Sequence, residues 1–302
     1  MADAATADGL VLRAFRAEDE DWWLATCTTL DPLLNAEYLR RSLHSPDVAT
    51  LRMTVAELAG GRVGVGRVLH RASDPNYFGL VLVEPHARGR GVGAALFADL
   101  CSVPHSLPWV TELAADPVSL GVARHWGFEP VSITTMSRLG LDPAPAPPDL
   151  PEGVRLHVLT CEEVDAAGLT GPLDGLLAAS ETEPEAVELG WTETFAELRG
   201  RFPDVVWALL EVDGELVALS CADPQDGEDW VLVYTGVAPP YRRRGLGRAV
   251  KRSLHAAIAA RGARSISTQN DSRNAEVLSL NAQLGYVAYQ ERIRLRRDLS
   301  TR

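Results

Sequence analysis

Hydrophobic and polar positions divide the chain into two halves that follow the same order of elements. Each half opens on a short apolar strand pattern followed by an acidic helix start, at Leu10 and at Val154. Each continues with two apolar runs separated by turn residues, Gly60–Gly61 in the first half and Asp213–Gly214 in the second. Such a pair of runs predicts a hairpin. The repeated order predicts a duplicated domain.

A loop rich in arginine and glycine follows in each half, between a strand and an amphipathic helix. The segments read FGLVLVEPHARGRGVGAALFADL and VLVYTGVAPPYRRRGLGRAV. After a further strand, a second helix ends on a glycine and an aromatic residue, at Gly127 and at Gly285. The loops lie 242 − 88 = 154 positions apart and the glycines 285 − 127 = 158. This order predicts an α/β fold in which each half has a mixed sheet with helices on both faces.

A proline-rich segment, LDPAPAPPDLPEG at residues 141–153, separates the two halves. Its prolines remove backbone donors and hold the chain extended. We therefore expect an N-terminal domain at residues 1–140, a linker at residues 141–153 and a C-terminal domain at residues 154–302.

The loop of the second half lies where a helix is expected to begin. Pro239 and Pro240 end the preceding strand, and an apolar stripe at helical spacing follows Gly247. The first N–H groups of a helix and its dipole favour an anion. Glycines let a ligand approach the backbone, and the arginines can neutralise phosphate charge. The loop therefore predicts a pyrophosphate site.

Two common phosphate loops do not fit. A P-loop needs a Lys-Ser/Thr ending, which neither loop has, and a dinucleotide fingerprint needs a third glycine near the start of a βαβ unit. What remains is the pattern Arg-x-x-Gly-x-Gly. Its residues are Arg88, Gly91 and Gly93 in the first half, and Arg242, Gly245 and Gly247 in the second.

On these residues the sequence resembles the GCN5-related N-acetyltransferases (GNAT), whose acetyl-CoA pyrophosphate loop has this pattern. The segment TQNDSRNAEVLSLNAQLGY resembles the family's downstream segment, with Asn274 and Asn281 at its asparagine positions. The resemblance implies two tandem GNAT-like domains, each a mixed, largely antiparallel twisted sheet flanked by helices. It also implies acetyl-CoA as co-substrate.

The resemblance assigns acetyl-CoA contacts to both loops and to the segment after the second one. In the second half these residues are Val237, Arg242, Arg243, Arg244, Gly245, Leu246, Gly247, Asn274 and Asn281. In the first half they are Val83, Arg88, Gly89, Arg90, Gly91, Val92 and Gly93. The strand before each loop is expected to splay from its neighbour, so that Val237 and Val83 can offer their N–H to the thioester oxygen.

The implied reaction is direct attack of a free amine on the thioester, for which the amine must first lose a proton. Many members of the family have a glutamate base on the strand before the loop and a tyrosine acid four residues before the final glycine. Asn281 and Ala123 stand at the tyrosine position here. The acid and base stay open, and the candidate catalytic residues are Tyr234, Glu228 and Asp229, ahead of Tyr286 and Tyr289.

We expect the second half to be catalytic, because it alone has Asn270, Asn274 and Asn281. The first half is expected to bind cofactor or to be structural. The alternatives are a sensor or scaffold that binds acetyl-CoA without turnover, and acyl transfer to another acceptor such as a carrier protein. Basic turns that merely start helices are a further interpretation of the loops, which their repetition disfavours.

Charge and composition limit the partners. A formal net charge of −12 argues against nucleic acid and suits a small-molecule amine, although protein amines stay possible. The four cysteines and seven histidines show no metal-ligand spacing, so no metal is predicted. The absence of an apolar span and of a signal pattern predicts a cytoplasmic protein without a membrane partner. The acidic residues Glu181, Glu183, Glu185 and Glu188 could form a subsite for a cation or a solvated helix face. The sequence indicates no oligomeric state.

Overall fold

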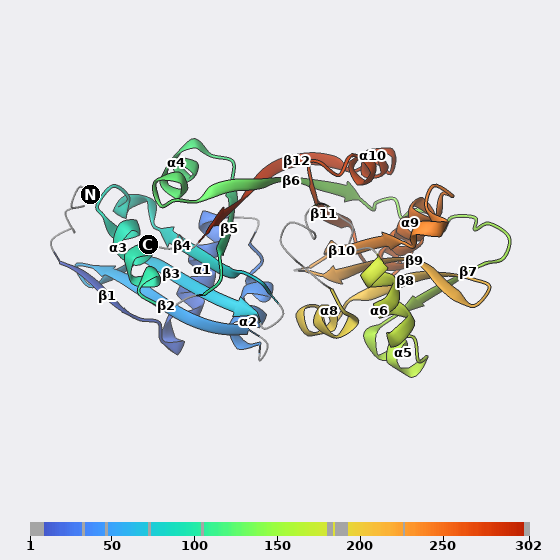
Figure 1. The fold of residues 1–302 in the computed structure, drawn as a ribbon, viewed down its shortest axis with the longest axis horizontal. Helices are drawn as coiled ribbons and strands as arrows, with labels where there is room; N and C mark the ends of the chain where they lie inside the picture. Colours follow the sequence, from blue (N-terminus) through green and yellow to red (C-terminus); the bar gives the residue numbers. More distant parts are fainter. Residues whose placement is uncertain are drawn as a thin grey trace. The chain divides into compact units, whose positions relative to one another are not determined.

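The structure, a computed structural model, describes residues 9–31, 34–45, 48–71, 74–103, 106–179, 184, 193–225 and 227–298 (Figure 1). The chain divides into two compact units, residues 1–131 with 294–302 and residues 132–293. Each unit is a mixed, largely antiparallel twisted sheet flanked by helices, as predicted. Residues 1–131 and 132–293 are called unit 1 and unit 2 below, with the C-terminal residues belonging to unit 1.

Unit 1 has five strands of its own and the end of a sixth. Their order is β1 (Leu10–Ala14), β2 (Val48–Leu58), β3 (Gly61–Arg71), β4 (Tyr77–Val83), β5 (Trp109–Ala114) and the end of β12 (Val287–Arg297). The helices are η1 (Ala17–Asp19), α1 (Glu20–Leu30), α2 (Ala36–His44), η2 (Pro85–Ala87), α3 (Val92–Cys101) and α4 (Pro117–His125). Strands β4 and β5 are parallel, and the pairs from β1 to β4 are antiparallel.

Unit 2 repeats this arrangement. Its strand order is β7 (Val154–Leu159), β8 (Val206–Val212), β9 (Glu215–Pro224), β10 (Asp229–Val237), β11 (Ser265–Asp271), β6 (Glu129–Gly140) and the first part of β12. The helices are α5 (Cys161–Ala166), α6 (Thr170–Ala179), α8 (Phe195–Arg201), η3 (Pro239–Tyr241), α9 (Leu246–Ala259) and α10 (Ala275–Gln283). Only β10 and β11 are parallel among the pairs β7–β8, β8–β9, β9–β10, β10–β11 and β11–β6.

Helices lie on both faces of the sheet in unit 2 (Figure 1), and an apolar core fills the space between helices and sheet on each face. On one face, α9 buries Val250, Leu254 and Ile258 against the strands. On the other, α6 and α8 bury residues such as Leu173 and Phe195. Burying such side chains contributes about 1.5–3 kcal/mol each, so the predicted apolar stripe fixes which side of α9 meets the sheet.

Two strands pass from the residues of one unit into those of the other. Residues 132–140 of β6 belong to unit 2, where Thr134 to Gly140 pair with β11. Residues 294–297 of β12 belong to unit 1, where buried Arg294 lies 3.8 Å from Glu112. The boundaries expected from sequence assign both segments to the opposite halves. Alternation of side chains identifies a strand, but it does not say with which sheet the strand pairs.

This exchange makes each half incomplete without the other. We expect residues 1–146 alone to be insoluble, because residues 132–140 lack their partner strand β11 and unit 1 lacks residues 294–297. Unpaired strands of this kind promote aggregation. Production together with residues 147–302 is expected to give a soluble pair that purifies as one complex. Soluble, monomeric residues 1–146 would contradict the exchange.

The hairpin turns differ slightly from expectation. Asp213–Gly214 joins β8 to β9, with φ of 51° and 85°, as predicted. In the first hairpin the turn residues are Ala59–Gly60, with φ of 49° and 78°, and Gly61 already begins β3.

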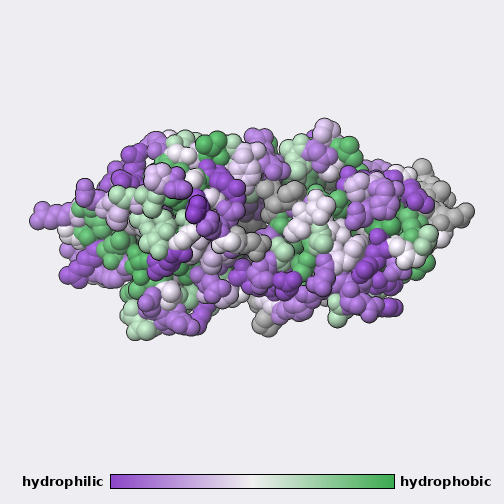
Figure 2. All heavy atoms as spheres, turned by 180° about the vertical axis from the view of Figure 1, so that it is seen from behind, coloured by the Kyte–Doolittle hydropathy of each residue, from purple (hydrophilic) through white to green (hydrophobic). Residues whose placement is uncertain are grey.

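Hydrophilic residues cover most of the face shown in Figure 2. Among the residues described, no helix combines the length and apolarity needed to cross a membrane.

Candidate active site

Strands β10 and β11 form a fork in unit 2. They pair only from Asp229 to Val231 on β10 and from Ser265 to Ser267 on β11, although β10 continues to Val237. Six residues of β10, about 20 Å of strand, therefore run on without this neighbour. The fork in unit 1 is similar, since β4 pairs with β5 only at Tyr77 and Phe78. The splay expected before each loop is thus present.

The backbone at the end of β10 faces the open side of the fork. Ala238 donates its N–H to the carbonyl of Val217 on β9, at 2.9 Å. Successive N–H groups of a strand point to opposite sides, so the N–H of Val237 points away from β9. In unit 1, Glu84 donates its N–H to the carbonyl of Val63 at 2.9 Å, so the N–H of Val83 likewise points away from β3. Both valines are oriented as a contact to a ligand in the fork requires.

The two loops share their geometry in detail. The Nε of Arg242 donates to the carbonyl oxygen of Val237 at 3.1 Å, and Arg88 makes the same bond to Val83 at 3.1 Å. Each first arginine thus ties the loop to the end of its strand. The sequence suggests phosphate neutralisation for these arginines, whereas the structure also gives each a bond that shapes the loop.

Helices α9 and α3 begin at glycines in the left-handed region. The N-caps Gly245 and Gly91 have φ of 79° and 80°, and neither helix has a side-chain cap. A glycine has no side chain to accept the N–H groups of the first turn, which are therefore open to an anion. The next glycines pack on the strand: a methyl group at Gly247 would lie 3.5 Å from Val237 Cγ2, and one at Gly93 would lie 3.6 Å from Val83 Cγ2.

The other predicted loop residues lie around these helix starts. Arg243 has a φ of 60° and the matching Gly89 a φ of 72°, so this loop position is left-handed in both units. The Arg244 guanidinium lies over the Tyr241 ring, 5.2 Å from its centroid. Leu246 and Val92 are buried as the first residues of their helices, and Arg90 lies exposed in its loop.

Glu228 and Asp229 lie at the closed end of the fork. Arg264 binds the carboxylate of Glu228 at 2.8 Å, and Arg138 binds that of Asp229 at 3.0 Å. Asp229 is eight residues before Val237 along β10, about 26 Å of strand. The structure therefore does not bring these two candidates together with the loop.

Tyr234 lies beside a bulge in β10. The register with β9 shifts between Leu232 and Tyr234, so that Val233 is the extra residue. Leu232 belongs to the core under α9, whereas Val233 and Tyr234 pack against the core under α6 and α8. A bulge leaves one residue outside the ladder and turns the following side chains. The register of β4 with β3 in unit 1 shows no such shift.

Asn274 and Asn281 hold helix α10 rather than standing open to the fork. The Oδ1 of Asn274 accepts from the N–H of Val277 at 3.2 Å and caps the helix. Asn281 is 2% exposed. Its Nδ2 donates to Oδ1 of Asn270 on β11 at 2.7 Å, and its Oδ1 accepts from Nζ of Lys251 at 2.5 Å. Asn281 thus joins helix α9 to strand β11.

Lys251 is the polar residue that sequence analysis missed. It is fully buried on α9, and its Nζ lies 5.5 Å from the centre of the Tyr286 ring. Burial lowers the pKa of Lys251 to about 7 and that of the neighbouring His255 to about 3. Burial also raises the pKa of Tyr286, whose hydroxyl is 2.8 Å from Nε2 of His255. One signal was in the sequence, since Lys251 is the only lysine among 302 residues.

The matching positions of unit 1 are apolar. By the spacing of the repeat, Phe97 corresponds to Lys251 (251 − 97 = 154) and Ala123 to Asn281 (281 − 123 = 158). Phe97 stacks on Trp126, with ring centroids 4.3 Å apart. Unit 1 therefore has a loop like that of unit 2 but lacks the buried amine and amide beside it.

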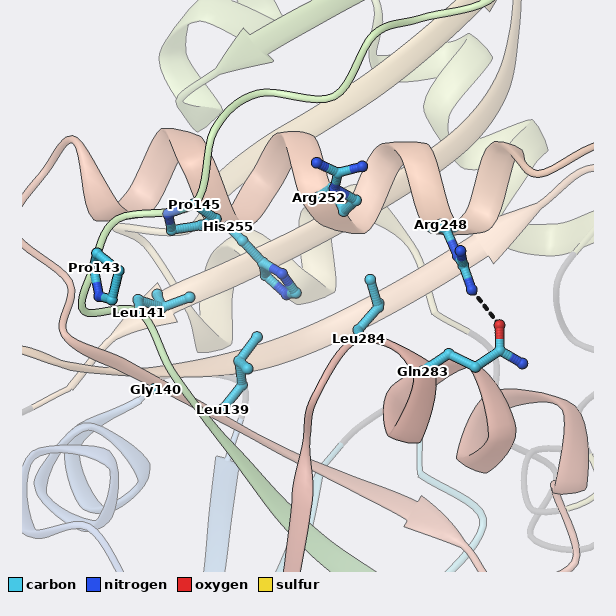
Figure 3. A pocket seen from close by; sticks show the side chains of 10 residues that line it. All are labelled: Leu139, Gly140, Leu141, Pro143, Pro145, Arg248, Arg252, His255, Gln283 and Leu284. Carbon is cyan, nitrogen blue, oxygen red and sulfur yellow. Dashed lines mark hydrogen bonds between the residues drawn. The ribbon is translucent and has the colours of Figure 1, made fainter.

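A pocket of about 300 Å³ lies beside α9 (Figure 3). Arg248, Arg252 and His255 line it from the helix, and Pro143 and Pro145 line it from the segment after β6. Arg248 donates to the side-chain oxygen of Gln283 at the end of α10. The pocket places His255, one helical turn after Lys251, next to an opening.

Some predictions cannot be placed. Glu181, Glu183, Glu185 and Glu188 lie outside the described residues. Among the residues that the structure does describe, no group of three or more His, Cys, Asp or Glu side chains could hold a metal ion.

Known proteins share parts of this sequence and its fold. Residues 174–286 match the model of the acetyltransferase (GNAT) family. The mycothiol acetyltransferase of Thermobispora bispora is 28% identical over 235 residues, which cover 74% of this chain and 77% of that protein. A tandem GNAT protein from the clavulanic acid biosynthesis pathway has a similar fold, with a TM-score of 0.78 and 20% identity over 97% of this chain and 99% of that one. A GCN5-related N-acetyltransferase from Sphaerobacter thermophilus also has a similar fold, with a TM-score of 0.74 and 18% identity over 97% of this chain and 96% of that one.

Proposed function

We propose that this chain transfers an acetyl group from acetyl-CoA to the primary amine of a small molecule. The proposal is supported by the match of residues 174–286 to the acetyltransferase (GNAT) family and by the fold shared with a tandem GNAT protein. The observation that carries the proposal is the fork of β10 and β11, which ends at the uncapped start of α9. The loop from Arg242 to Gly247 would hold the pyrophosphate, and the backbone of β10 would hold the pantetheine arm. Val237 would offer its N–H to the thioester.

The acceptor amine is proposed to enter from the face covered by α6 and α8. Val233 and Tyr234 turn toward that face at the bulge of β10. In the reaction a C–N bond forms as the C–S bond of the thioester breaks. The amine must give up a proton and the leaving thiolate must gain one. Of the three catalytic candidates, Tyr234 is the one whose position beside the bulge supports a role.

Unit 1 is proposed to bind acetyl-CoA without turnover or to be structural. Its loop, with Val83, Arg88 and Gly91, matches that of unit 2 in geometry. Its equivalents of Lys251 and Asn281 are Phe97 and Ala123, which cannot exchange a proton. This observation supports the hypothesis of a sensor or scaffold, which binds acetyl-CoA without turnover, for unit 1 alone.

Release of free CoA thiol in the presence of amines tests the proposal. We expect the native chain to release thiol from acetyl-CoA with at least one member of a panel of polyamines, amino sugars and amino-acid derivatives. The T. bispora relative is named as a mycothiol acetyltransferase, so mycothiol without its acetyl group is the first amine to test. Acetyl-CoA without amine is the control for hydrolysis. Tight binding of acetyl-CoA without thiol release from any amine would favour a sensor.

A further inference from the structure

Helices α9 and α10 bury a polar cluster against the part of β11 that does not pair with β10. The cluster consists of Lys251, Asn281 and Asn270, joined by hydrogen bonds of 2.5 and 2.7 Å. Asn270 lies beyond Ser267, where β11 no longer pairs with β10. The cluster therefore borders the fork in which acetyl-CoA is proposed to bind.

The cluster also lies close to the start of α9. Leu280, the residue before Asn281, approaches this helix start: a methyl group at Gly247 would lie 3.7 Å from Leu280 Cδ2. Asn281 itself stands four residues before Gly285, the position at which the family resemblance expects a tyrosine acid. The position lacks a proton donor of its own, and the side chain bound to it is a lysine.

Position 251 has a lysine in a chain whose other long basic side chains are all arginines. The chain has 29 lysine and arginine residues, of which 28 are arginine and only Lys251 is lysine. A guanidinium does not release its proton in proteins, whereas a lysine amine does so readily when it is buried. Of the 29 lysine and arginine side chains, the one that can release its proton is thus the one placed beside the fork.

Lys251 has few groups around it that would hold it permanently charged. An ammonium has three donors, but among the residues described the hydrogen-bond acceptor of Lys251 is Asn281 Oδ1. The titratable groups that face it are His255 on α9 and Tyr286 after α10. His255 is neutral at pH 7 because burial lowers its pKa to about 3. Among the residues described, no carboxylate pairs with Lys251, and Asn281 Oδ1 accepts from one of its three donors.

We propose that Lys251 supplies the proton taken up by the leaving thiolate during acetyl transfer in unit 2. This role rests on the proposed function. As the C–S bond breaks, its electron pair stays on sulfur and takes a proton from the Lys251 ammonium, which becomes a neutral amine. The proton lost by the acceptor amine restores the ammonium, so protons balance over one turnover.

Kinetics of matched variants test this role. With the amine found in the thiol-release assay, Lys251→Met is expected to lower kcat at least about 100-fold. Acetyl-CoA Kd should stay within about threefold, since no pyrophosphate contact is lost. Lys251→Arg is expected to be as slow, because arginine keeps its proton. Arg252→Met, an exposed neighbour on α9, is the control and should keep native kcat. A bend near pH 7 in the native kcat profile should be absent from Lys251→Met.

A measurement independent of activity separates failure of this role from failure of the proposed function. Chain labelled with ¹³C-lysine gives a single Cε signal, because there is one lysine. We expect its chemical shift to titrate near pH 7 and to move when acetyl-CoA binds. Titration near pH 10.4, the unperturbed value, would overturn the role of Lys251 even if the chain transfers acetyl groups. Native kcat in Lys251→Met would overturn it equally.

Discussion

Gly245→Glu is expected to weaken acetyl-CoA binding in unit 2 at least about 100-fold, as measured by calorimetric titration. The substitution places a carboxylate at the N-terminus of α9, where the proposed pyrophosphate would sit. Two negative groups would then compete for the same N–H donors. No atom lies within 4 Å of a Cβ built on Gly245, so the side chain fits without a clash. The backbone cost of a residue at φ of 79° is about 1–2 kcal/mol.

Matched glycines control this result. Gly168 also has a positive φ, of 68°, with open space around its Cβ, and it lies away from both loops. Gly168→Glu therefore carries the backbone cost alone and should bind acetyl-CoA as the native chain does. Gly91→Glu should leave binding in unit 2 intact and remove a second site if unit 1 has one. Unchanged binding in Gly245→Glu would contradict the assignment of the loop.

The stability of the native chain relative to Lys251→Met is expected to rise with pH above neutrality. The folded-state pKa of Lys251 is about 7, below its unfolded value of about 10.4. Between these values the unfolded chain holds a proton on Lys251 that the folded chain lacks. Unfolding then takes up a proton, so the free energy of unfolding increases with pH by about 1.4 kcal/mol per unit.

Urea unfolding at pH 7.5 and pH 9.5 measures this difference. The native free energy of unfolding, minus that of Lys251→Met, should increase by about 2–3 kcal/mol between the two pH values. Groups that titrate in both proteins cancel in the comparison, as does the fixed cost of leaving Asn281 without its donor. A difference that stays constant with pH would mean that Lys251 keeps an ordinary pKa in the folded chain.

The loops could be predicted from sequence because their signals are local. A strand ended by proline, an arginine three residues before a glycine and an apolar stripe after it specify a helix start wherever they occur. The structure confirms the fold class, and it shows the same bond from Arg242 to Val237 as from Arg88 to Val83. The spacing of the repeat further relates Phe97 to Lys251, which no single half reveals.

The rest depends on contacts between distant residues. Residues 132–140 read equally well as the last strand of the first half, and only their pairing with β11 assigns them to unit 2. The bulge at Val233 adds one residue without changing the apolar pattern of β10. Glu228 and Asp229 are candidates from sequence because they stand at the entrance of the strand that ends at Val237. In the structure, β10 extends over nine residues, so its entrance and its end lie about 26 Å apart. The apolar pattern of α9 does not predict the burial of Lys251, because charged residues of an amphipathic helix ordinarily lie on its exposed face.

Hydrogen exchange with and without acetyl-CoA locates the ligand on the native chain, because it needs no variant. We expect slower exchange of backbone amides from Tyr234 to Ala249 when acetyl-CoA is bound. This range covers the part of β10 that does not pair with β11, the loop and the first turn of α9. Protection of the second loop with none at residues 79–95 would identify unit 2 as the binding unit. Protection confined to residues 79–95, or none in either loop, would contradict the account.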